Sequence, residues 1–491
     1  MAIRIYSTLT GREEPLVPLY PDGVLRVYVC GLTPKFHAHV GHARVFVAMD
    51  VIRRYLEHRG YRLKHIQNFT DVDDKIIQRA AREGRDPVST AQSYIDSYFD
   101  SMDRLNVLRA HEYPTVTSYM ERIIDFVAGL VEKGHAYAVD GNVYFDVATF
   151  PEYGKLSRRD LDSQLVAARK ELEPGKRDPR DFALWKRAKE GEPSWPSPWG
   201  PGRPGWHIEC STMARETLGD QLDIHGGGAD LMFPHHENEI AQSESLTGKN
   251  PFARYWAHAG LVNIGDEKMA HSLENFLTVR TVLDRYDPMA VRLYLIGTHY
   301  RQALQFVTEG DPNETGLQVR GIEDSETSLA RLRRAIGQEP LDLEGELELE
   351  SVRAFEEAMD ADVNTPGALA VIFDLAREVN RRRALQQGQS RGQPQALRMA
   401  QVERDVGQEE IDRARRTIVR LLGVLGIELA PQREERLVPI EPYVHLLLDV
   451  RRKLRDMKQW ALSDEIRDRL ADLGVVVEDR PGGESTWRRA D

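Results

Sequence analysis

A strand, a loop and the start of a long helix lie within residues 27–42, which read VYVCGLTPKFHAHVGH. The β-branched run that ends at Cys30 predicts a strand over residues 26–30. Apolar residues then recur at helical spacing over residues 40–59 and stop at Gly60, which predicts a long amphipathic helix. The segment therefore predicts a strand that leads through a short loop into a helix.

A second strand follows this helix directly. Residues 62–69 predict a strand, and a further helix is predicted to begin at Asp71. Strand, helix and strand in this order form a βαβ unit, which is right-handed and pairs its strands in parallel. We therefore predict an α/β fold built on a parallel sheet.

Later regions differ from this opening pattern. Residues 114–203 are rich in charge, proline and tryptophan and predict an insertion. Beyond residue 316 the chain is helix-patterned, except for a polar stretch over residues 386–395 that predicts a flexible loop. A tail from residue 437 predicts a helix followed by a strand at residues 475–477. With a length of 491 residues, this organisation indicates about three or four domains.

The composition is that of an ordinary globular chain, with 41% hydrophobic and 29% charged residues. No apolar stretch approaches the roughly 20 residues of a membrane span, the amino terminus lacks a signal-peptide core, and two cysteines suit a reducing compartment. We therefore expect a cytoplasmic monomer with no membrane partner. A net charge of −12 disfavours indiscriminate nucleic-acid binding. Arginine clusters at residues 381–383, 413–416 and 451–453 would form either a local RNA-binding face or a merely solvated surface.

The only two cysteines of the chain, Cys30 and Cys210, lie far apart, and each neighbours residue types that bind soft metals. After the second cysteine, Pro234 suits the first turn of a helix, so His235 and Glu239 would share one helical face. Two thiolates, one imidazole and one carboxylate predict a tetrahedral zinc site with one ion per chain. Spacing alone leaves two alternatives open, a disulfide or two inert buried thiols.

Three further features are typical of a nucleotide site. His39 and His42 flank a glycine at the predicted helix start, where free N–H groups and imidazole donors favour a polyphosphate. The run HGGGAD, residues 225–230, places glycines where backbone can lie against a base, with a carboxylate for ribose hydroxyls. Lys268 offers a point charge for phosphates. Each feature alone is compatible with surface histidines, a bare turn or a solvated lysine, and their combination predicts ATP binding.

These motifs, in this order, resemble those of the cysteinyl-tRNA synthetase family, a class I aminoacyl-tRNA synthetase family, over essentially the whole chain. The resemblance rests on residues 30–33, 39–42, 68–71, 202–210, 225–230, 233–242, 359–366 and 463–468. It implies a Rossmann-type catalytic domain in two halves, residues 1–113 and 204–260, split by a connective insertion at 114–203. It further implies a stem-contact fold at 261–315, a helical bundle at 316–436 and a small mixed α/β anticodon-binding domain at 437–491.

The resemblance also implies an activity, which is ATP-dependent activation of L-cysteine to cysteinyl-adenylate and transfer to the 3′ end of tRNA(Cys). Zinc would bind the substrate thiol and reject serine without an editing domain, and Mg²⁺ would accompany ATP. The implied catalytic residues are His39, His42, Lys268 and His271, which with Gly227, Gly228 and Asp230 would bind ATP. The implied cysteine-binding residues are Cys30, Thr70 and Trp206. The implied tRNA-binding residues are Trp460, Asp464, Arg467, Asp479 and Trp487.

Two departures from the family pattern fall where the phosphates of ATP would bind. His271 stands where the family usually carries a second lysine, and Ala270 and Glu274 also differ from the pattern. Lys35 lies in a loop that usually contains a tyrosine. Because a histidine is only partly charged near neutral pH, adenylation would be reduced unless Lys35 restores the charge.

Three other functions fit parts of the sequence. A paralogue could join activated cysteine to a small amine, as the mycothiol-pathway ligase does, although such an enzyme has no need of the C-terminal segment. A tRNA-binding paralogue with impaired adenylation is favoured only by the changes at His271 and Glu274. A metal hydrolase is disfavoured because two thiolate ligands would make the zinc less electrophilic.

Overall fold

The computed structural model describes residues 2–158, 175–264, 267–268, 277–309, 318–389, 397–429, 441–472, 475–479 and 485–489. These residues belong to two compact units, one within residues 1–429 and the other within residues 430–491. Within this described part, no helix has both the length and the apolar character needed to cross a membrane.

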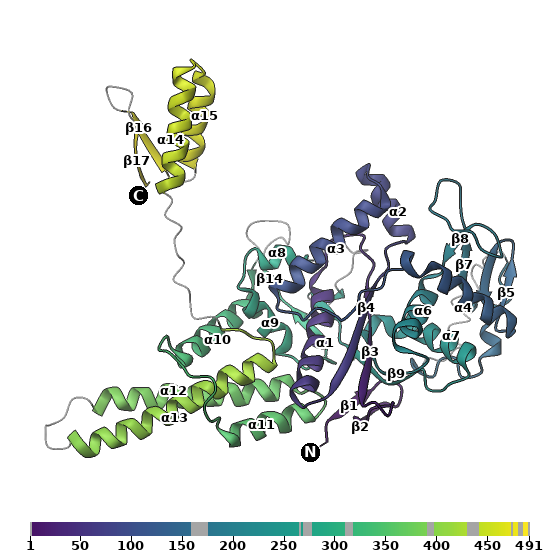
Figure 1. The fold of residues 1–491 in the computed structure, drawn as a ribbon, viewed down its shortest axis with the longest axis horizontal. Coiled ribbons are helices and arrows are strands. Elements are labelled where there is room, and N and C mark those ends of the chain that lie inside the picture. Colours follow the sequence, from purple (N-terminus) through teal and green to yellow (C-terminus); the bar gives the residue numbers. More distant parts are fainter. Residues whose placement is uncertain are drawn as a thin grey trace. The chain divides into compact units, whose positions relative to one another are not determined.

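The centre of the larger unit is a four-stranded parallel sheet with the strand order β10-β9-β3-β4. Figure 1 labels three of these strands, β3, β4 and β9. Its strands are β3 (Val24–Leu32), β4 (Arg62–Phe69), β9 (Leu222–Gly228) and β10 (Ala253–Ala259). Helix α1 (Val40–His58) connects β3 to β4, and Val24 pairs with Arg62 across the two strands. The predicted α/β fold with a parallel sheet is therefore confirmed.

Helix α1 begins and ends within one residue of the predicted positions. His39 is its N-cap, and its apolar face, which includes Phe46 and Ile52, is buried in the main core. The helix ends at Arg59, and Gly60 then adopts a φ of 82°, a conformation that glycine takes without steric cost. Local sequence signals are enough to position this helix.

Helix α2 (Asp74–Glu83) begins later than predicted. Its N-cap is Asp73, whose carboxylate accepts a hydrogen bond from the N–H of Lys75 at 2.8 Å. Asp71, the predicted start, instead accepts a hydrogen bond from the N–H of Thr117 at 3.0 Å and so connects the end of β4 to the insertion. The predicted start is wrong because two aspartates precede the helix and the second one, Asp73, provides the cap.

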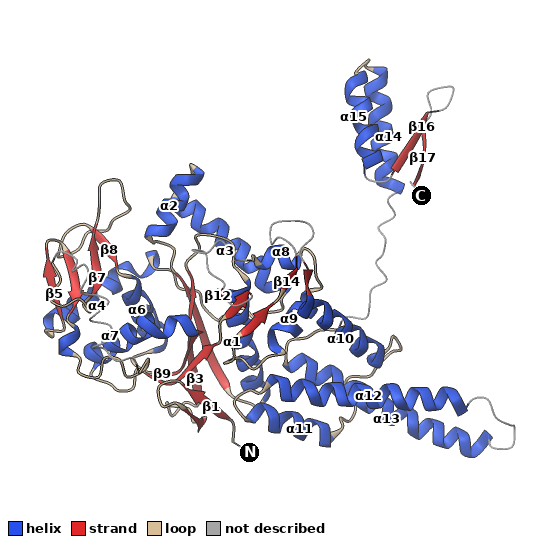
Figure 2. Cartoon of the chain, turned by 180° about the vertical axis from the view of Figure 1, so that it is seen from behind, coloured by secondary structure: helices blue, strands red, loops and turns tan. Residues whose placement is uncertain are grey.

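The insertion contains a second sheet, which the sequence patterns do not predict. It is antiparallel, with the strands β5 (Ala136–Val139), β6 (Asn142–Phe145), β7 (Phe182–Arg187) and β8 (Gly202–Pro204). Figure 2 shows this sheet beside the helices α4 (Met120–Glu132), α6 (Trp206–Leu218) and α7 (Glu237–Thr247). A shared apolar core, which includes the fully buried Trp185, holds these elements together.

The chain then passes through short strands and helices into a helical region. The short elements are β11 (Val262–Ile264), β12 (Glu267–Lys268), α8 (Val279–Leu283), α9 (Pro288–Ile296), β13 (Leu304–Phe306), β14 (Thr308–Glu309) and β15 (Gln318–Val319). The helical region contains α10 (Arg320–Ile336), α11 (Leu349–Asp360), α12 (Thr365–Gln389) and α13 (Leu397–Val424). The remaining elements of the larger unit are β1 (Arg4–Ser7), β2 (Arg12–Pro15) and α3 (Pro87–Arg104).

The polar stretch over residues 386–395 differs from its prediction as a loop. Helix α12 continues to Gln389, because glutamine, at 386, 387 and 389, is a good helix former even without an apolar face. Residues 390–396 lie outside the described part of the chain. The predicted start of this loop is therefore wrong by four residues, since 386–389 are helical.

The smaller unit contains two helices and a strand pair. The elements are α14 (Glu441–Asp456), α15 (Trp460–Asp472), β16 (Val475–Asp479) and β17 (Ser485–Arg489), with the two strands antiparallel. Val444, Leu448, Leu470 and Val475 form its core. This is the order of helix and strand that the tail of the sequence predicts.

Candidate active site and metal cluster

A pocket of about 780 Å³ opens where the strands of the parallel sheet end. The carboxyl ends of β3, β9 and β10 contribute Cys30, Gly228 and Ala259 to its lining. Ligands of open parallel sheets bind at this edge, because the loops that leave the strands diverge there and leave a crevice. The pocket is therefore the candidate active site.

Four buried donor groups meet beside this pocket: Cys30 of β3, Cys210 of α6, His235 of the segment just before α7, and Glu239 of α7. The Cys30 Sγ lies 3.6 Å from the Cys210 Sγ and 3.3 Å from the Glu239 Oε1. The His235 Nε2 lies 3.0 Å from the same carboxylate oxygen. Both cysteines are free thiols, so they form no disulfide. The group could hold a metal ion.

A kink at Phe233 precedes the helical segment that holds His235 and Glu239. Phe233 has φ −140° and ψ 133°, whereas His236 and Glu237 have helical φ and ψ values. Residues 232–236 have π-helical hydrogen bonding, so the regular α-helix α7 begins at Glu237, later than predicted. The predicted contact across one helical face is confirmed, because the His235 side chain reaches Glu239 at i to i+4.

The electrostatics of the four donors suit a cation. Burial raises the pKa of the Cys30 thiol well above its usual range, and its hydrogen bond with Cys210 raises it further. Burial acts in the same direction on Cys210, but the hydrogen bond from Cys30 together with the charge and hydrogen bond of His235 outweighs it and lowers the Cys210 pKa to about 6. Burial would also raise the pKa of Glu239, yet His225 and His235 hold it well below its usual range. These pKa values favour a thiolate at Cys210 and a carboxylate at Glu239, both buried. Against the effect of burial, Glu239 and Cys210 raise the pKa of His235 to about 10, which favours a positive charge beside them.

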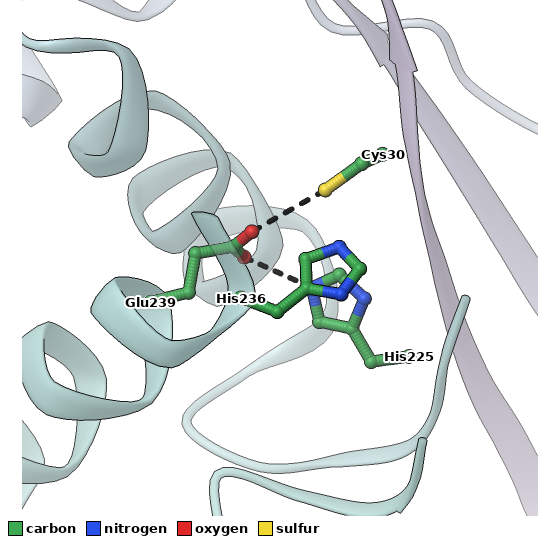
Figure 3. A group of neighbouring side chains, drawn as sticks. All are labelled: Cys30, His225, His236 and Glu239. Atoms are coloured by element: carbon green, nitrogen blue, oxygen red, sulfur yellow. Dashed lines mark hydrogen bonds and ion pairs between the residues drawn. The ribbon is translucent and has the colours of Figure 1, made fainter. Parts of the chain in front are cut away.

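A second group of donors shares Cys30 and Glu239 and adds His225 and His236 (Figure 3). The His225 Nε2 lies 2.9 Å from the Glu239 Oε2, and the His225 ring stacks on Trp256 at 4.5 Å. His236 is engaged elsewhere, since its Nδ1 lies 2.8 Å from the Nε2 of His258. His225 thus contacts the Glu239 oxygen that is not in contact with Cys30 and His235.

Two residues predicted to bind the substrate cysteine have different environments. Trp206 lines the pocket, is 40% exposed and lies over His235 with ring centroids 4.4 Å apart. Thr70 is buried, and its hydroxyl donates a hydrogen bond to the Glu209 Oε2 at 2.9 Å. Burial raises the pKa of Glu209 well above its usual range. Of the two, only Trp206 reaches the described pocket lining.

His39 and His42 lie at the start of α1 and line the same pocket. Each ring nitrogen Nδ1 accepts a hydrogen bond from the backbone N–H of the other residue, at 3.2 and 3.3 Å, and the rings stack with centroids 3.6 Å apart. This reciprocal capping box fixes both imidazoles at the helix end. The pair is therefore preorganised at the N-terminal end of α1, beside the pocket.

The glycine run ends at the pocket, but its members differ. Gly228 and Asp230 line the pocket, and a Cβ at Gly228 would lie only 2.5 Å from the Asp230 Oδ1. A Cβ at Gly227 would instead lie 2.8 Å from the His236 ring, and Gly227 is absent from the described pocket lining. Gly228 thus provides room for a carboxylate, whereas Gly227 provides room for a histidine.

Both ends of the predicted lysine loop are bonded to the pocket wall. Lys268 pairs with Asn263 in the β11–β12 ladder, and the neighbouring Val262 lines the pocket. On the other side, Leu277 accepts a hydrogen bond at 3.0 Å from the N–H of Val40, the residue after His39. The side chain of Lys268 and the residues Ala270, His271 and Glu274 lie outside the described part of the chain.

The predicted tRNA-binding residues all belong to the smaller unit. Trp460 is 55% exposed at the start of α15, and Arg467 lies 3.5 Å from Asp464 one helical turn away. Trp487 is partly buried and packs against the core of this unit, and Asp479 ends β16. Trp460 and Arg467 are thus available to a partner, whereas Trp487 has a packing role.

Sequence reasoning missed several charged and polar residues of the site. Lys75, Lys176 and Lys186 line the pocket, and His225 contacts Glu239. Nothing in the local sequence distinguishes these lysines from solvated ones, because only the fold brings them to the pocket from positions about 40 to 150 residues beyond Lys35. His225 lies within the glycine run, but its partner depends on how β9 faces α7.

Three family models match the chain. The model described as tRNA synthetases class I (C) catalytic domain matches residues 17–312. A DALR domain matches residues 354–430, and the model described as Cysteinyl-tRNA ligase anticodon binding domain matches residues 439–488.

Curated relatives match over the full length. Proteins named cysteine–tRNA ligase are similar from Heliobacterium modesticaldum, at 44% identity with 100% of both chains covered, and from Pelotomaculum thermopropionicum, at 47% identity with 99% of this chain and 100% of the relative covered. A protein of the same name from Moorella thermoacetica is 45% identical, with 99% of this chain and 100% of the relative covered.

Solved structures with low sequence identity share the fold. Methionyl-tRNA synthetase from Mycobacterium tuberculosis in complex with methionyl-adenylate has a TM-score of 0.55 at 15% identity, with 82% of this chain and 89% of that chain covered. LeuRS from Agrobacterium radiobacter K84, in a ternary complex with tRNA and LeuAMS, has a TM-score of 0.56 at 12% identity, with 84% of each chain covered.

Proposed function

Since the chain belongs to the cysteine–tRNA ligase family of class I aminoacyl-tRNA synthetases, we propose that it ligates cysteine to tRNA in two steps at the described pocket. The observation that carries this proposal is one loop. Residues 30–42 begin at a thiol of the donor cluster and end at the paired histidines, and both ends line the same pocket. The match to an anticodon-binding model over residues 439–488 disfavours ligation to a small amine.

In the first step the carboxylate of cysteine attacks the α-phosphorus of ATP, and the bond to pyrophosphate breaks. In the second step a terminal ribose hydroxyl of tRNA attacks the carbonyl carbon of the adenylate and releases AMP. Neither step requires a protein nucleophile, so the residues act by positioning and by stabilising charge. We assign His39, His42 and Lys268 to the phosphates, and Gly228 and Asp230 to the nucleoside. Mg²⁺ would accompany ATP and neutralise part of its charge.

The donor cluster with both cysteines fits zinc better than the second group, which contains Cys30, His225, His236 and Glu239. Cys30, Cys210, His235 and Glu239 provide two sulfur donors, one nitrogen and one oxygen, which is a set that zinc accepts in tetrahedral geometry. When bound, zinc would offer a coordination position to the substrate thiolate. His225 then acts on Glu239, since its hydrogen bond to the Oε2 holds the carboxylate with the Oε1 toward the cysteines.

Choice of cysteine over serine follows from this donor set. An apolar pocket separates near-isosteric substrates by only about 1–3 kcal/mol. A site that binds the substrate sulfur as a ligand rejects a hydroxyl far more strongly, because oxygen is a harder donor in a position that suits thiolate. Trp206, which lies over His235 and faces the pocket, would contact the ammonium group of cysteine through its ring.

The smaller unit provides the contact to tRNA(Cys) in this proposal. Trp460 is exposed enough to stack on a base, and Arg467 beside Asp464 can reach phosphate or base edges. We further propose a cytoplasmic monomer, which agrees with two reduced thiols in a buried cluster.

Cysteine-dependent ATP–pyrophosphate exchange tests this function, measured with and without tRNA. Exchange without tRNA, followed by cysteinylation of tRNA(Cys), is expected. Exchange that proceeds normally while tRNA is never charged would favour ligation to a small amine. Binding of tRNA with no exchange at any cysteine concentration would indicate a paralogue with impaired adenylation.

A further inference from the structure

Four lysines line the pocket, and two of them have described partners. The Lys186 Nζ lies 3.6 Å from the Asp74 carboxylate, and Lys176 lies near the ring of Tyr144, 5.9 Å from its centroid. Lys35 and Lys75 differ, since neither forms an ion pair with any residue that the structure describes. The pocket therefore contains two lysines that form no ion pair within the described part of the chain, although Asp73 also lines the pocket.

These two ammonium groups lie close enough to affect each other. Burial lowers the pKa of Lys35, and the charge of Lys75 and a hydrogen bond with it lower that pKa further. Asp73 acts in the opposite direction, but its carboxylate is also the N-cap of α2. Two like charges side by side at a pocket wall destabilise each other, and an anion between them would relieve the repulsion.

Both lysines are held by rigid neighbours. Lys35 precedes Phe36, whose ring lies under the Arg79 guanidinium at 4.9 Å and beside Tyr94 at 6.0 Å, so the loop is anchored on α2 and α3. Lys75 lies in the first turn of α2, where the Asp73 cap fixes the backbone. The pair is thus formed before any ligand binds, which lowers the cost of binding.

We propose that Lys35 and Lys75 form a two-lysine subsite that binds one phosphate group of a substrate in this pocket, an inference that rests on the proposed function. Lys35 lies on the loop between Cys30 of the donor cluster and His39, so the phosphate would lie between the amino-acid end and the histidine pair. Lysine is suited to this role because its ammonium is a point charge that any phosphate oxygen can approach. The phosphate belongs either to the triphosphate of ATP or to the 3′ end of tRNA.

The test compares Lys35→Ala and Lys75→Ala with Lys249→Ala. Lys249 is an exposed lysine paired with Asp220 and absent from the pocket lining, so its variant makes the same change in net charge. If the subsite binds ATP, each pocket variant raises the KM for ATP in cysteine-dependent exchange about tenfold, the loss expected for one hydrogen bond to a charged group. Lys35→Arg should restore most of the affinity, because it keeps the charge.

If the subsite instead binds tRNA, exchange stays normal and the KM for tRNA in aminoacylation rises by a similar factor. Calorimetric titration with ATP and with inorganic pyrophosphate measures binding at the same site without turnover. It therefore tests the subsite even if the wild-type protein shows no exchange. Absence of exchange would overturn the proposed function and leave the subsite untouched. The subsite is overturned if both pocket variants match Lys249→Ala in ATP affinity, pyrophosphate affinity and tRNA KM.

Discussion

The donor cluster and the phosphate side of the pocket lie at the two ends of one loop, yet they are built differently. Cys30, Cys210, His235 and Glu239 are each at most 4% exposed, and their hydrogen bonds connect them to one another. His39, His42 and Lys35 are only partly buried and line an open pocket. The donor cluster is buried and closed, whereas the phosphate side is an open pocket surface lined by polar and charged side chains.

The difference teaches where selectivity and rate come from. Burying a thiolate and a carboxylate costs free energy unless positive charge lies beside them, so the cluster favours a bound metal cation. Partly solvated charges are each worth less, because water screens them, and several must share the work of stabilising phosphate. Changes in the cluster should therefore have large, all-or-none effects, and changes at the phosphates should have graded ones.

The largest expected effect concerns the substrate and not the protein. Serine should be activated at least about 10⁴-fold less efficiently than cysteine, the discrimination reached by sites that bind a specific polar group of the substrate. The measurement is kcat/KM for exchange with each amino acid, using serine freed of cysteine. A ratio near 100, which pocket shape alone can give, would mean that the cluster does not read the thiol.

Substitution Cys210→Ser should remove the metal and lower cysteine activation by at least about a hundredfold, the upper end of the loss caused by removing a group that only orients a metal ligand. The reason is that one of only two sulfur donors is replaced by a harder oxygen. Metal content of the purified protein should fall from about one zinc per chain to nearly none. Ser245→Ala, a small change on the same helix as Glu239, should keep the metal. Full zinc occupancy in Cys210→Ser would refute the donor set.

Substitution His225→Phe should weaken metal affinity by about 10–100-fold, because the ring still stacks on Trp256 but no longer orients Glu239. Competition with a chelator measures this affinity. His65→Phe is the matched control, since His65 is also a buried strand histidine but is not a member of either donor group. Equal affinities in both variants would show that Glu239 needs no second partner.

The fold was predictable from sequence where its signals are local. The β3–α1–β4 unit was predicted because periodicity, a helix-start motif and Gly60 mark each boundary, and this α/β prediction and the family prediction are both confirmed. The antiparallel sheet of the insertion was not predicted, because its strands are three to six residues long and pair across distant segments. Short strands carry too little periodicity to be recognised alone.

The site was predictable where residue types are rare. Two cysteines in 491 residues drew attention to the cluster, and the structure brings them together with His235 and Glu239. Thr70, predicted to bind cysteine, is buried, and its hydroxyl donates a hydrogen bond to Glu209, a contact that the local sequence does not indicate. The residue assignments of the cysteine, ATP and tRNA sites stay predictions.

The smallest expected effect is at His271, the predicted phosphate residue whose position in the structure is not described. His271→Lys should raise the rate of cysteine activation a few-fold at pH 8–9 and very little at pH 6. An ordinary imidazole has a pKa of about 6.5, so its charge is present below that pH and lost above it, whereas lysine keeps its charge up to about pH 10. A positive side chain beside the developing pyrophosphate stabilises the transition state, but a solvated side chain contributes only modestly. The measurement is exchange from pH 6 to 9, with Lys35→Ala as the paired variant. If His271→Lys is silent across this range while Lys35→Ala loses activity, the charge expected from the family's second lysine is provided by Lys35. If both substitutions leave the rate unchanged, Lys268 with Mg²⁺ is sufficient. The phosphate chemistry would then depend on a few essential groups, as metal binding does in the donor cluster.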